Sequence, residues 1–347
     1  MRQALPPYYR TPLLAPLVSL AEQGAFPDPL LRMGIRRLVA ARKRELVQGI
    51  GRVGADALAH RALAIHTDTA NEQHYEVPAE LFEAALGPRL KYSSCYYPDA
   101  GTTLAEAEEA MLALTCEHAD LADGQDVLEL GCGWGSLTLW MAARYPRSRI
   151  TAMSNSHSQR EYILSRARSQ GLTNVEILTC DFNDFDAEGQ FDRVVSVEMF
   201  EHLQNWDTAF ERVARWLKPE GRAFLHVFCH RTHAYLFEGQ NNWMASHFFT
   251  GGLMPAFDLP HAFRQHLAVE ADWWIAGSHY ERTSNDWLAE FDASTPALRS
   301  VLSDTYGEDA RRWLHRWRLF FLAVAEMFGY DEGAEWGVGH YRLKRGG

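Results

Sequence analysis

Basic residues are scarce in this sequence relative to acidic ones. It has 34 Lys and Arg against 45 Asp and Glu, which gives a formal net charge of −11 at pH 7. Nucleic acid is bound mainly by clustered Lys and Arg, so this deficit argues against a nucleic-acid partner. The one basic concentration, at residues 32–44, is predicted to be a helix whose charged face is either solvated or rests on a membrane surface.

Long apolar runs and paired cysteine motifs are also absent. No run approaches the length of about 20 residues that crosses a bilayer, so an integral membrane protein is not expected. The apolar stretch near residue 15 is short and interrupted by proline, which argues against a signal peptide. The five cysteines have no CxxC spacing, and an odd number cannot be fully paired within one chain. We therefore expect a reducing compartment, the cytoplasm.

Hydrophobic periodicity divides the chain in two. Residues 1–65 are predicted to form a helical N-terminal extension or lid. From Val127, short apolar runs (VLEL, RITAM, VEIL, RVVSV, RAFLHVF) alternate with helical stretches, which is typical of a parallel sheet wrapped by helices. We expect a Rossmann-like α/β domain over residues 66–347, with insertions covering the active site at about 231–320.

Three further elements are expected after the fifth strand. VEADWWIAG predicts a strand, and GVGHYRLKR predicts a closing strand at the edge of the sheet. A buried helix is predicted from the spacing of Trp313, Trp317, Phe320, Phe321, Val324 and Phe328.

The segment VLELGCGWG has the pattern of a cofactor loop. A strand runs directly into Gly131, Gly133 and Gly135, where glycine allows a sharp turn and the close approach of a ligand. The glycine spacing differs from the dinucleotide fingerprint, and Glu129 would repel a pyrophosphate. S-adenosylmethionine (SAM) has no phosphate and carries an ammonium and a sulfonium, so the acid favours SAM as the cofactor.

The ends of the next two strands offer groups for the rest of this cofactor. Asn155 and Gln159 are predicted to bind the ribose, where many nucleotide sites place an acid. Asp181 and Phe182 are predicted to bind the adenine, as hydrogen-bond acceptor and apolar cover. The alternative for Asp181 is that it only caps the following helix.

Several motifs occur in the order of a known family. They are NEQHYEVP (from Asn71), LKYSSCYY, TTLAEAEEAML, LELGCGWGSLTL, SNSHSQREYI, EMFEH and FFTGGLMP. Over residues 65–347 the chain resembles the cyclopropane-fatty-acid synthase superfamily of methyltransferases, and within it the coclaurine N-methyltransferase branch, which methylates isoquinoline amines. The resemblance implies a class I SAM-dependent methyltransferase sheet and a homodimer by family analogy. It also implies that Tyr92 and Ser93 hold the methionine part of SAM and that EMFEH contributes acceptor-side residues.

EMFEH supplies the candidate catalytic residues. If a helix begins after the strand RVVSV, then Glu198, Glu201 and His202 share one face. An amine that is protonated in solution must lose a proton before it attacks the methyl group, and His202 is the natural base. The two glutamates would hold the amine, and Tyr280 or Trp273 could add cation–π attraction. A structural hydrogen bond is the alternative role for His202.

A lipid-modifying synthase is the alternative enzyme. Such synthases use a bound bicarbonate to remove a proton, and the resemblance places that site at Ser94, Glu201, His226, Phe228 and Tyr280. Ser94 and Phe228 depart from the usual cysteine and isoleucine, and Glu198 stands where synthases commonly have glycine. These departures favour an amine acceptor over an unsaturated lipid.

The cluster HVFCHRTH contains metal-ligand residue types. On a strand, however, His226 and His230 face one side and Cys229 the other, so we expect no metal site. The sequence thus predicts a SAM-dependent N-methyltransferase of a small, aromatic or isoquinoline-like amine, with Tyr280, His226 and Phe228 at the acceptor. A protein that binds the cofactor without chemistry is the rival from another class.

Overall fold

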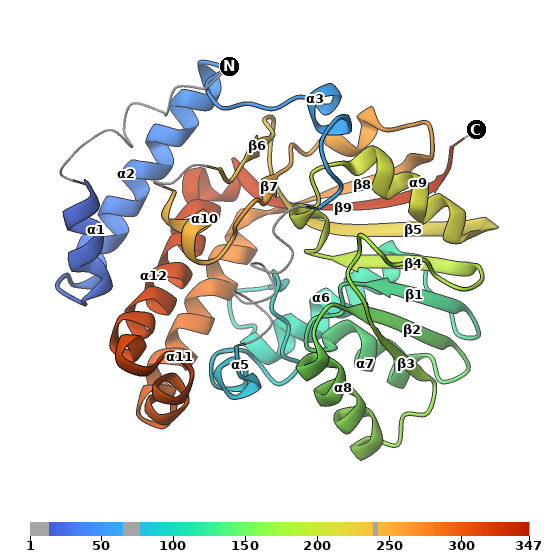
Figure 1. The fold of residues 1–347 in the computed structure, drawn as a ribbon, viewed down its shortest axis with the longest axis horizontal. Helices are drawn as coiled ribbons and strands as arrows, with labels where there is room; N and C mark the ends of the chain where they lie inside the picture. Colours follow the sequence, from blue (N-terminus) through green and yellow to red (C-terminus); the bar gives the residue numbers. More distant parts are fainter. Residues whose placement is uncertain (1–13, 65–76, 239–241, 347) are drawn as a thin grey trace.

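The computed structural model describes residues 14–64, 77–238 and 242–346, and its centre is a seven-stranded sheet in the order β3-β2-β1-β4-β5-β9-β8 (Figure 1). The first five strands are parallel: β3 Val175–Thr179, β2 Arg149–Ser154, β1 Asp126–Leu130, β4 Phe191–Val197 and β5 Leu217–His230. The last two, β9 Trp336–Arg345 and β8 Leu267–Ala276, are antiparallel to their neighbours. The α/β class predicted from alternating apolar runs is confirmed.

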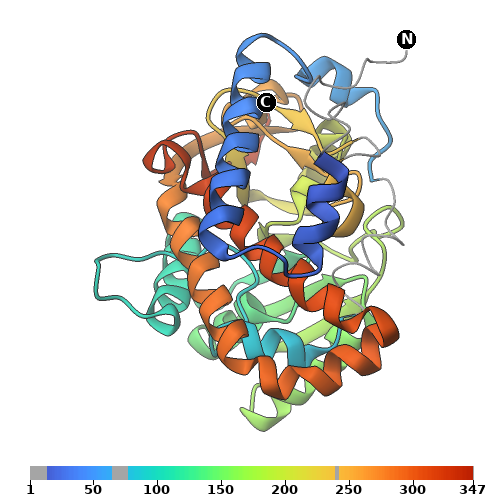
Figure 2. The ribbon, with the colours of Figure 1, turned by 90° about the vertical axis from the view of Figure 1, so that its left-hand side faces the viewer.

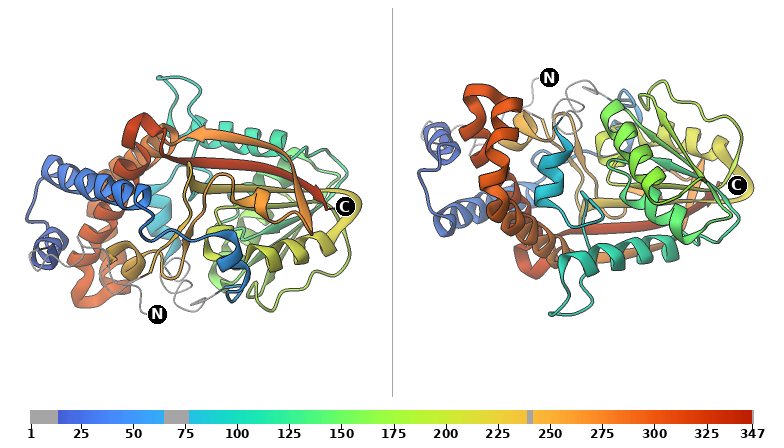
Figure 3. Two further views of the ribbon diagram at one scale, coloured as in Figure 1. Left: turned by 90° about the horizontal axis from the view of Figure 1, so that it is seen from above. Right: turned by 90° about the horizontal axis from the view of Figure 1, so that it is seen from below.

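Helices cover both faces of this sheet (Figure 3). The helices α6 Leu104–His118, α7 Ser136–Arg144 and α8 His157–Ser169 bury their apolar residues on one face, with Val127 and Ile150. On the other face α9 Trp206–Trp216 packs with Leu128 and Val194. Successive residues of β1 thus serve opposite layers, which explains why Val127 and Leu128 are both fully buried.

The last strand corrects one expectation. GVGHYRLKR forms most of β9, but this strand lies between β5 and β8 and is not an edge. The edge position belongs to β8, which contains all of VEADWWIAG except its last glycine and confirms the strand predicted there. The side chains of Val338, Tyr341 and Leu343 are fully buried because they have neighbours on both flanks.

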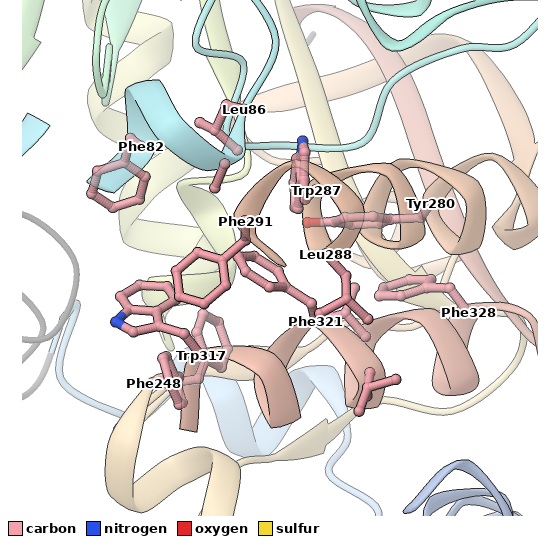
Figure 4. Packing of buried hydrophobic residues seen from close by; sticks show 14 of the residues in the cluster. Phe82, Leu86, Phe248, Tyr280, Trp287, Leu288, Phe291, Trp317, Phe321 and Phe328 are labelled. Atoms are coloured by element: carbon pink, nitrogen blue, oxygen red, sulfur yellow. The ribbon is translucent and has the colours of Figure 1, made fainter. Parts of the chain in front are cut away.

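Two long helices follow β8 and carry an aromatic core. They are α11 Gly277–Tyr306 and α12 Ala310–Phe328, and the predicted buried helix is α12. Figure 4 shows side chains of α11 and α12 facing one another, including Trp287, Phe291, Trp317 and Phe321, with Phe82 from α5 Ala79–Ala85 beside them. Within the predicted periodic set, Trp313 and Phe320 are only partly buried. Short 3₁₀ turns, Gly307–Asp309 and Tyr330–Gly333, follow these two helices.

The insertion between β5 and β8 is built of short elements. They are β6 Tyr235–Leu236, α10 Trp243–His247, β7 Leu253–Met254 and a 3₁₀ turn at Leu259–Ala262. The strands β6 and β7 form a small separate sheet. Apolar side chains of this insertion belong to the same core clusters as the main sheet and α12, so it is fixed to the fold.

The described part of the N-terminal region contains the helices α1 Leu14–Glu22, α2 Asp28–Val47 and α3 Ala55–Ala59. Figure 2 shows α1 and α2 lying across α12. Part of the basic face of α2 is paired with protein, because the guanidinium groups of Arg32 and Arg36 both bind the buried carboxylate of Glu326. A domain boundary near residue 65 stays a prediction, and most of NEQHYEVP lies outside the described residues.

Candidate active site

A cavity of about 830 Å³ opens at the carboxyl ends of the parallel strands. Its walls come from the loops after β1, β2, β3 and β4, from the aromatic insertion, and from α2 and α12. Ligands of open parallel sheets bind at this edge, because the loops there converge on one crevice. The volume lies within the range of about 300–1,000 Å³ that is usual for small-molecule sites.

The glycine loop after β1 forms one wall of the cavity. Gly131 and Gly135 have φ angles of +76° and +80°, a region that side chains with a Cβ rarely adopt. A Cβ at Gly131 would come within 2.6 Å of the Met199 side chain, and one at Gly135 within 2.6 Å of Ile163. Glycine is therefore required at both positions by conformation and by space. Gly133, between them, also lines the cavity.

Glu129 is a buried acid at the end of β1 that lines the same cavity. The Thr138 hydroxyl donates a hydrogen bond of 2.5 Å to its Oε2 atom. Burial nevertheless raises the pKa of Glu129 to about 8. The carboxyl group is therefore set to become fully ionised when a cation binds beside it.

The four residues predicted to bind the nucleoside lie together in this cavity: Asn155, Gln159, Asp181 and Phe182. The side chain of Gln159 is oriented by Ser154, whose hydroxyl donates to Gln159 Oε1 at 2.7 Å. Asp181 Oδ1 accepts a hydrogen bond of 2.7 Å from the backbone N–H of Asn183. Asp181 therefore caps a local turn, as the alternative role suggested, and it lines the cavity as well.

Unsatisfied donors near the loop test whether SAM fits. Trp134 Nε1 and Ser136 Oγ are buried, line the cavity and have no hydrogen-bond partner among the described residues. Tyr92 and Ser93 line the cavity as well. A free carboxylate would satisfy such donors, and SAM carries one beside its ammonium. The donors, the acid Glu129 and the nucleoside-facing groups together fit SAM.

Glu198 is held in an unusual conformation directly after β4. Its φ angle of +48° is rare for a residue with a side chain, and such strain persists only where surrounding contacts impose it. Its Oε1 atom accepts hydrogen bonds from the Ser94 backbone N–H at 2.9 Å and contacts His226 Nε2 at 3.2 Å. Its Oε2 atom accepts one from the Tyr280 hydroxyl at 2.7 Å. Three sequence-distant groups therefore fix one carboxylate.

The predicted helical face over EMFEH is wrong. Only a 3₁₀ turn, Phe200–His202, forms there, and Glu198 precedes it in the left-handed region. Glu198 and His202 line the cavity, whereas Glu201 lies behind its wall and is fully buried. Glu201 Oε1 accepts a hydrogen bond of 2.6 Å from the Phe228 backbone N–H, and its Oε2 has no partner among the described residues.

Burial shifts the protonation of all three groups. It raises the pKa of Glu198, although Lys91 and the hydrogen bonds to the carboxylate oppose the shift. It raises the pKa of Glu201 further, because the neighbouring Glu198 carboxylate adds to the effect. It lowers the pKa of His202 to about 4 despite attraction by Glu198. His202 is therefore neutral at pH 7.

Of the other residues predicted on the acceptor side, some line the cavity and others do not. Tyr280 and Phe228 line the cavity, and the Tyr280 ring stacks on Phe328 with centroids 4.4 Å apart. His226 is fully buried behind Glu198. Trp273 does not line the cavity; it lies on β8 and stacks on His118. The expectation that Trp273 meets the acceptor is therefore wrong.

Sequence reasoning missed one residue of the site, Lys91. Lys91 is fully buried and donates to Ser93 Oγ at 2.5 Å and to the Ser94 carbonyl at 2.6 Å, so it fixes the loop that binds Glu198. A lone lysine in LKYSSCYY gave no signal of this. The insertion expected to cover the site does line the cavity, where Phe237, Trp243, Phe248 and Phe249 form an aromatic wall with Phe320 of α12. Within the described ranges, no three His, Cys, Asp or Glu side chains are placed to hold a metal ion.

The chain is similar in sequence to known methyltransferases. The chain is 34% identical over 347 residues to an (S)-coclaurine N-methyltransferase of Thalictrum flavum subsp. glaucum, covering 96% of each protein. It is 34% identical over 244 residues to the cyclopropane-fatty-acyl-phospholipid synthase of Escherichia coli (strain K12), covering 70% of this chain and 60% of that one.

Solved structures share the fold as well. The crystal structure of a coclaurine N-methyltransferase bound to N-methylheliamine and SAH superposes with a TM-score of 0.90 at 34% identity, covering 95% of this chain and 99% of that one. A mycolic acid cyclopropane synthase complexed with SAH and CTAB gives a TM-score of 0.67 at 22% identity, covering 80% and 98%, and supports the fold alone.

The fold and the site define a class I SAM-dependent methyltransferase. Residues 64–332 match the family model of mycolic acid cyclopropane synthetase, and the chain belongs to this family. It is also related to plant alkaloid N-methyltransferases.

Proposed function

We propose that this methyltransferase transfers its methyl group to the nitrogen of a small aromatic or isoquinoline-like amine. The observation that carries the proposal is the position of the Glu198 carboxylate. It is bound by Ser94, His226 and Tyr280, three of the positions at which the family resemblance places the bicarbonate of the lipid-modifying synthases. A carboxylate belonging to the chain itself thus takes the place of the exchangeable base.

Glu198 is the proposed proton acceptor. SAM supplies an electrophilic methyl group on a sulfonium, and an acceptor amine must present a free lone pair to it. Sequence alone favoured His202 as the base, but its pKa of about 4 makes it a weak proton acceptor. Burial raises the pKa of Glu198, which brings it closer to that of an ammonium and improves proton transfer. His202, neutral and lining the cavity, orients the amine.

The aromatic side chains that line the cavity suit an amine that carries an aromatic ring. Phe228, Phe249 and Tyr280 line the cavity around Glu198 and His202. Aromatic faces attract cations and bury flat rings, so the wall accommodates both the ammonium and its apolar frame. The 34% identity to a coclaurine N-methyltransferase over nearly the whole chain supports the same substrate class.

The test is a methylation assay with purified protein and labelled SAM. Secondary amines built on tetrahydroisoquinoline are offered in parallel with vesicles of unsaturated phospholipid, each with and without added bicarbonate. We expect transfer to at least one amine, with a rate that bicarbonate leaves unchanged. Transfer to the lipid alone, or a strict requirement for bicarbonate, would overturn the proposal.

A further inference from the structure

Three histidines from different elements form a continuous row behind Glu198. His226 lies on β5 and is the direct register partner of His340 on β9. His340 Nε2 lies 2.9 Å from His226 Nδ1, and His340 Nδ1 lies 2.9 Å from Nδ1 of His118 on α6. Each separation is that of a hydrogen bond between imidazole rings. The row begins at the carboxylate itself, because His226 Nε2 lies 3.2 Å from Glu198 Oε1.

The row leads from the active site to the protein surface. His226 and His340 are fully buried, whereas His118 is half-buried at the end of its helix. The His118 ring is held by Trp273, with centroids 3.9 Å apart and ring planes within 9° of parallel. Trp273 is itself the register partner of His340 on the edge strand β8. The sheet therefore positions His226 and His340 directly, and His118 on α6 is held against it through Trp273.

We propose that His226, His340 and His118 carry the proton of the acceptor amine from Glu198 to solvent. This inference rests on the proposed N-methylation. Glu198 takes one proton from the ammonium, which frees the nitrogen lone pair, and passes it to His226 Nε2. His226 Nδ1–H then gives a proton to His340 Nε2, and His340 Nδ1–H gives one to His118 Nδ1. His118 Nε2–H releases a proton to water or buffer. Each ring then holds its other tautomer, and ring motion with proton exchange outside the row restores the first tautomers, because reversal along the row would return the proton to Glu198.

The surroundings keep the buried rings uncharged between transfers. Burial lowers the pKa of both His226 and His340, and the buried ammonium of Lys91 lowers each further. His118 faces Glu117 on its own helix and Arg342 on β9, whose effects on its pKa oppose each other, while burial lowers it. Neutral imidazole can accept a proton on one nitrogen and release another from the second, which a relay requires.

The first test removes His118, the residue that releases the proton to solvent. His118→Ala is assayed for amine methylation in a bulky buffer that cannot enter the space of the lost ring. We expect kcat to fall by about tenfold, less than the about 100-fold typical of losing a direct acid–base group. Added imidazole should restore kcat with a saturable dependence on its concentration, while the Kd for SAM stays unchanged. A purely structural histidine would not give this buffer rescue.

Two further variants complete the experiment. His340→Gln should lower kcat without rescue by imidazole, because the position is fully buried, and SAM binding reports whether the variant is folded. The matched control is His261→Ala: His261 is also half-buried and bonded, to Asp272 at 2.7 Å, but lies outside the row. We expect wild-type kcat for the control.

The outcomes separate the relay from the proposed function. If the wild-type protein methylates no amine, the proposed function fails before any variant is made. If the wild type is active and His118→Ala keeps full kcat in bulky buffer, or loses kcat without rescue by imidazole, the relay is overturned.

Discussion

At the scale of single residues, the proposed chemistry depends on the protonation state of the Glu198 carboxyl group. We predict that Glu198→Gln lowers kcat for amine methylation by about 10²–10⁴-fold, the usual contribution of a general base. Because burial raises the pKa of Glu198, wild-type kcat/KM should rise with pH through that raised value as the carboxylate becomes ionised. The variant should lose this limb of the pH profile.

The control for that experiment is Glu80→Gln, an exposed glutamate on α5. It should match the wild type in kcat and in its pH profile. SAM affinity, measured by calorimetry, should be the same for both variants, because neither change touches the cofactor loop. Full activity in Glu198→Gln would exclude the residue from proton transfer.

Glu129 leads to a second prediction, about cofactor affinity. Its pKa of about 8 means that below pH 8 the group must lose a proton when the ammonium of SAM binds beside it. We expect SAM to bind more tightly as pH rises toward 8, by at most about tenfold per pH unit, the limit for one proton. Titrations across this range with wild type and Glu129→Gln provide the measurement.

Methylthioadenosine is the matched ligand, because it lacks the amino-acid part of SAM. Its affinity should show no such dependence in either protein. A Glu129→Gln variant that retained the wild-type slope for SAM would show that another group titrates.

Residue patterns predicted the donor side of the site better than the acceptor side. Residues such as Gly131, Asn155 and Asp181 lie within two residues of the ends of parallel strands, and chain order alone brings such loops to one edge of the sheet. The conformation of Glu198 could not be predicted in this way. It depends on contacts with Ser94, His226 and Tyr280, which tertiary folding brings to the residue, and no local propensity favours a left-handed glutamate.

At the scale of elements, the attachment of α1 depends on one carboxylate. Glu22 accepts hydrogen bonds from Trp243 Nε1 at 2.8 Å and Arg316 Nε at 3.1 Å. Burial opposes its ionisation, yet these bonds and the charge of Arg316 hold the pKa of Glu22 below its ordinary 4.5. We predict that Glu22→Gln costs about 1.5–3 kcal/mol of the free energy of unfolding, as for hydrogen bonds to a charged group.

The sign of the pH effect follows from the lowered pKa. The stabilisation by Glu22 is fully present above the unfolded pKa of about 4.5 and is lost as pH falls through the lower folded pKa. Urea unfolding of wild type and variant at neutral pH and at pH 3 measures it. The difference between the two proteins should shrink at pH 3, and an equal difference at both pH values would contradict the assignment.

The position of β9 shows what element patterns leave undetermined. GVGHYRLKR was recognisable as a strand, but a short apolar run fits an interior strand as well as an edge. Its neighbours are β5 and β8, and the chain between β5 and β9 includes an aromatic insertion and two long helices. Pairing over such a distance is decided by packing, which is why the sequence placed this strand wrongly.

At the scale of the whole molecule, the cavity joins segments that lie far apart in the chain. The loops of the sheet, the insertion before β8, α2 and α12 all line it. Figure 1 shows α2 and α12 beyond the end of the sheet. The α/β architecture was predictable because it repeats one strand–helix unit. The covering of the cavity by α2 was not, because an amphipathic helix does not specify its partner. No helix in the described ranges is long and apolar enough to cross a membrane.

Because different segments form the different walls of the cavity, the choice of acceptor amine can change without a change in cofactor binding. The walls near Gly131 and Asp181 are supplied by loops of the parallel sheet. Trp243, Phe249 and Phe320 come from the insertion and α12, which contribute no strand to that sheet. Substitutions in those segments can reshape the space for a new amine while the loops after β1, β2 and β3, which are predicted to bind SAM, keep their geometry. Engineering of acceptor choice should therefore begin with these aromatic positions.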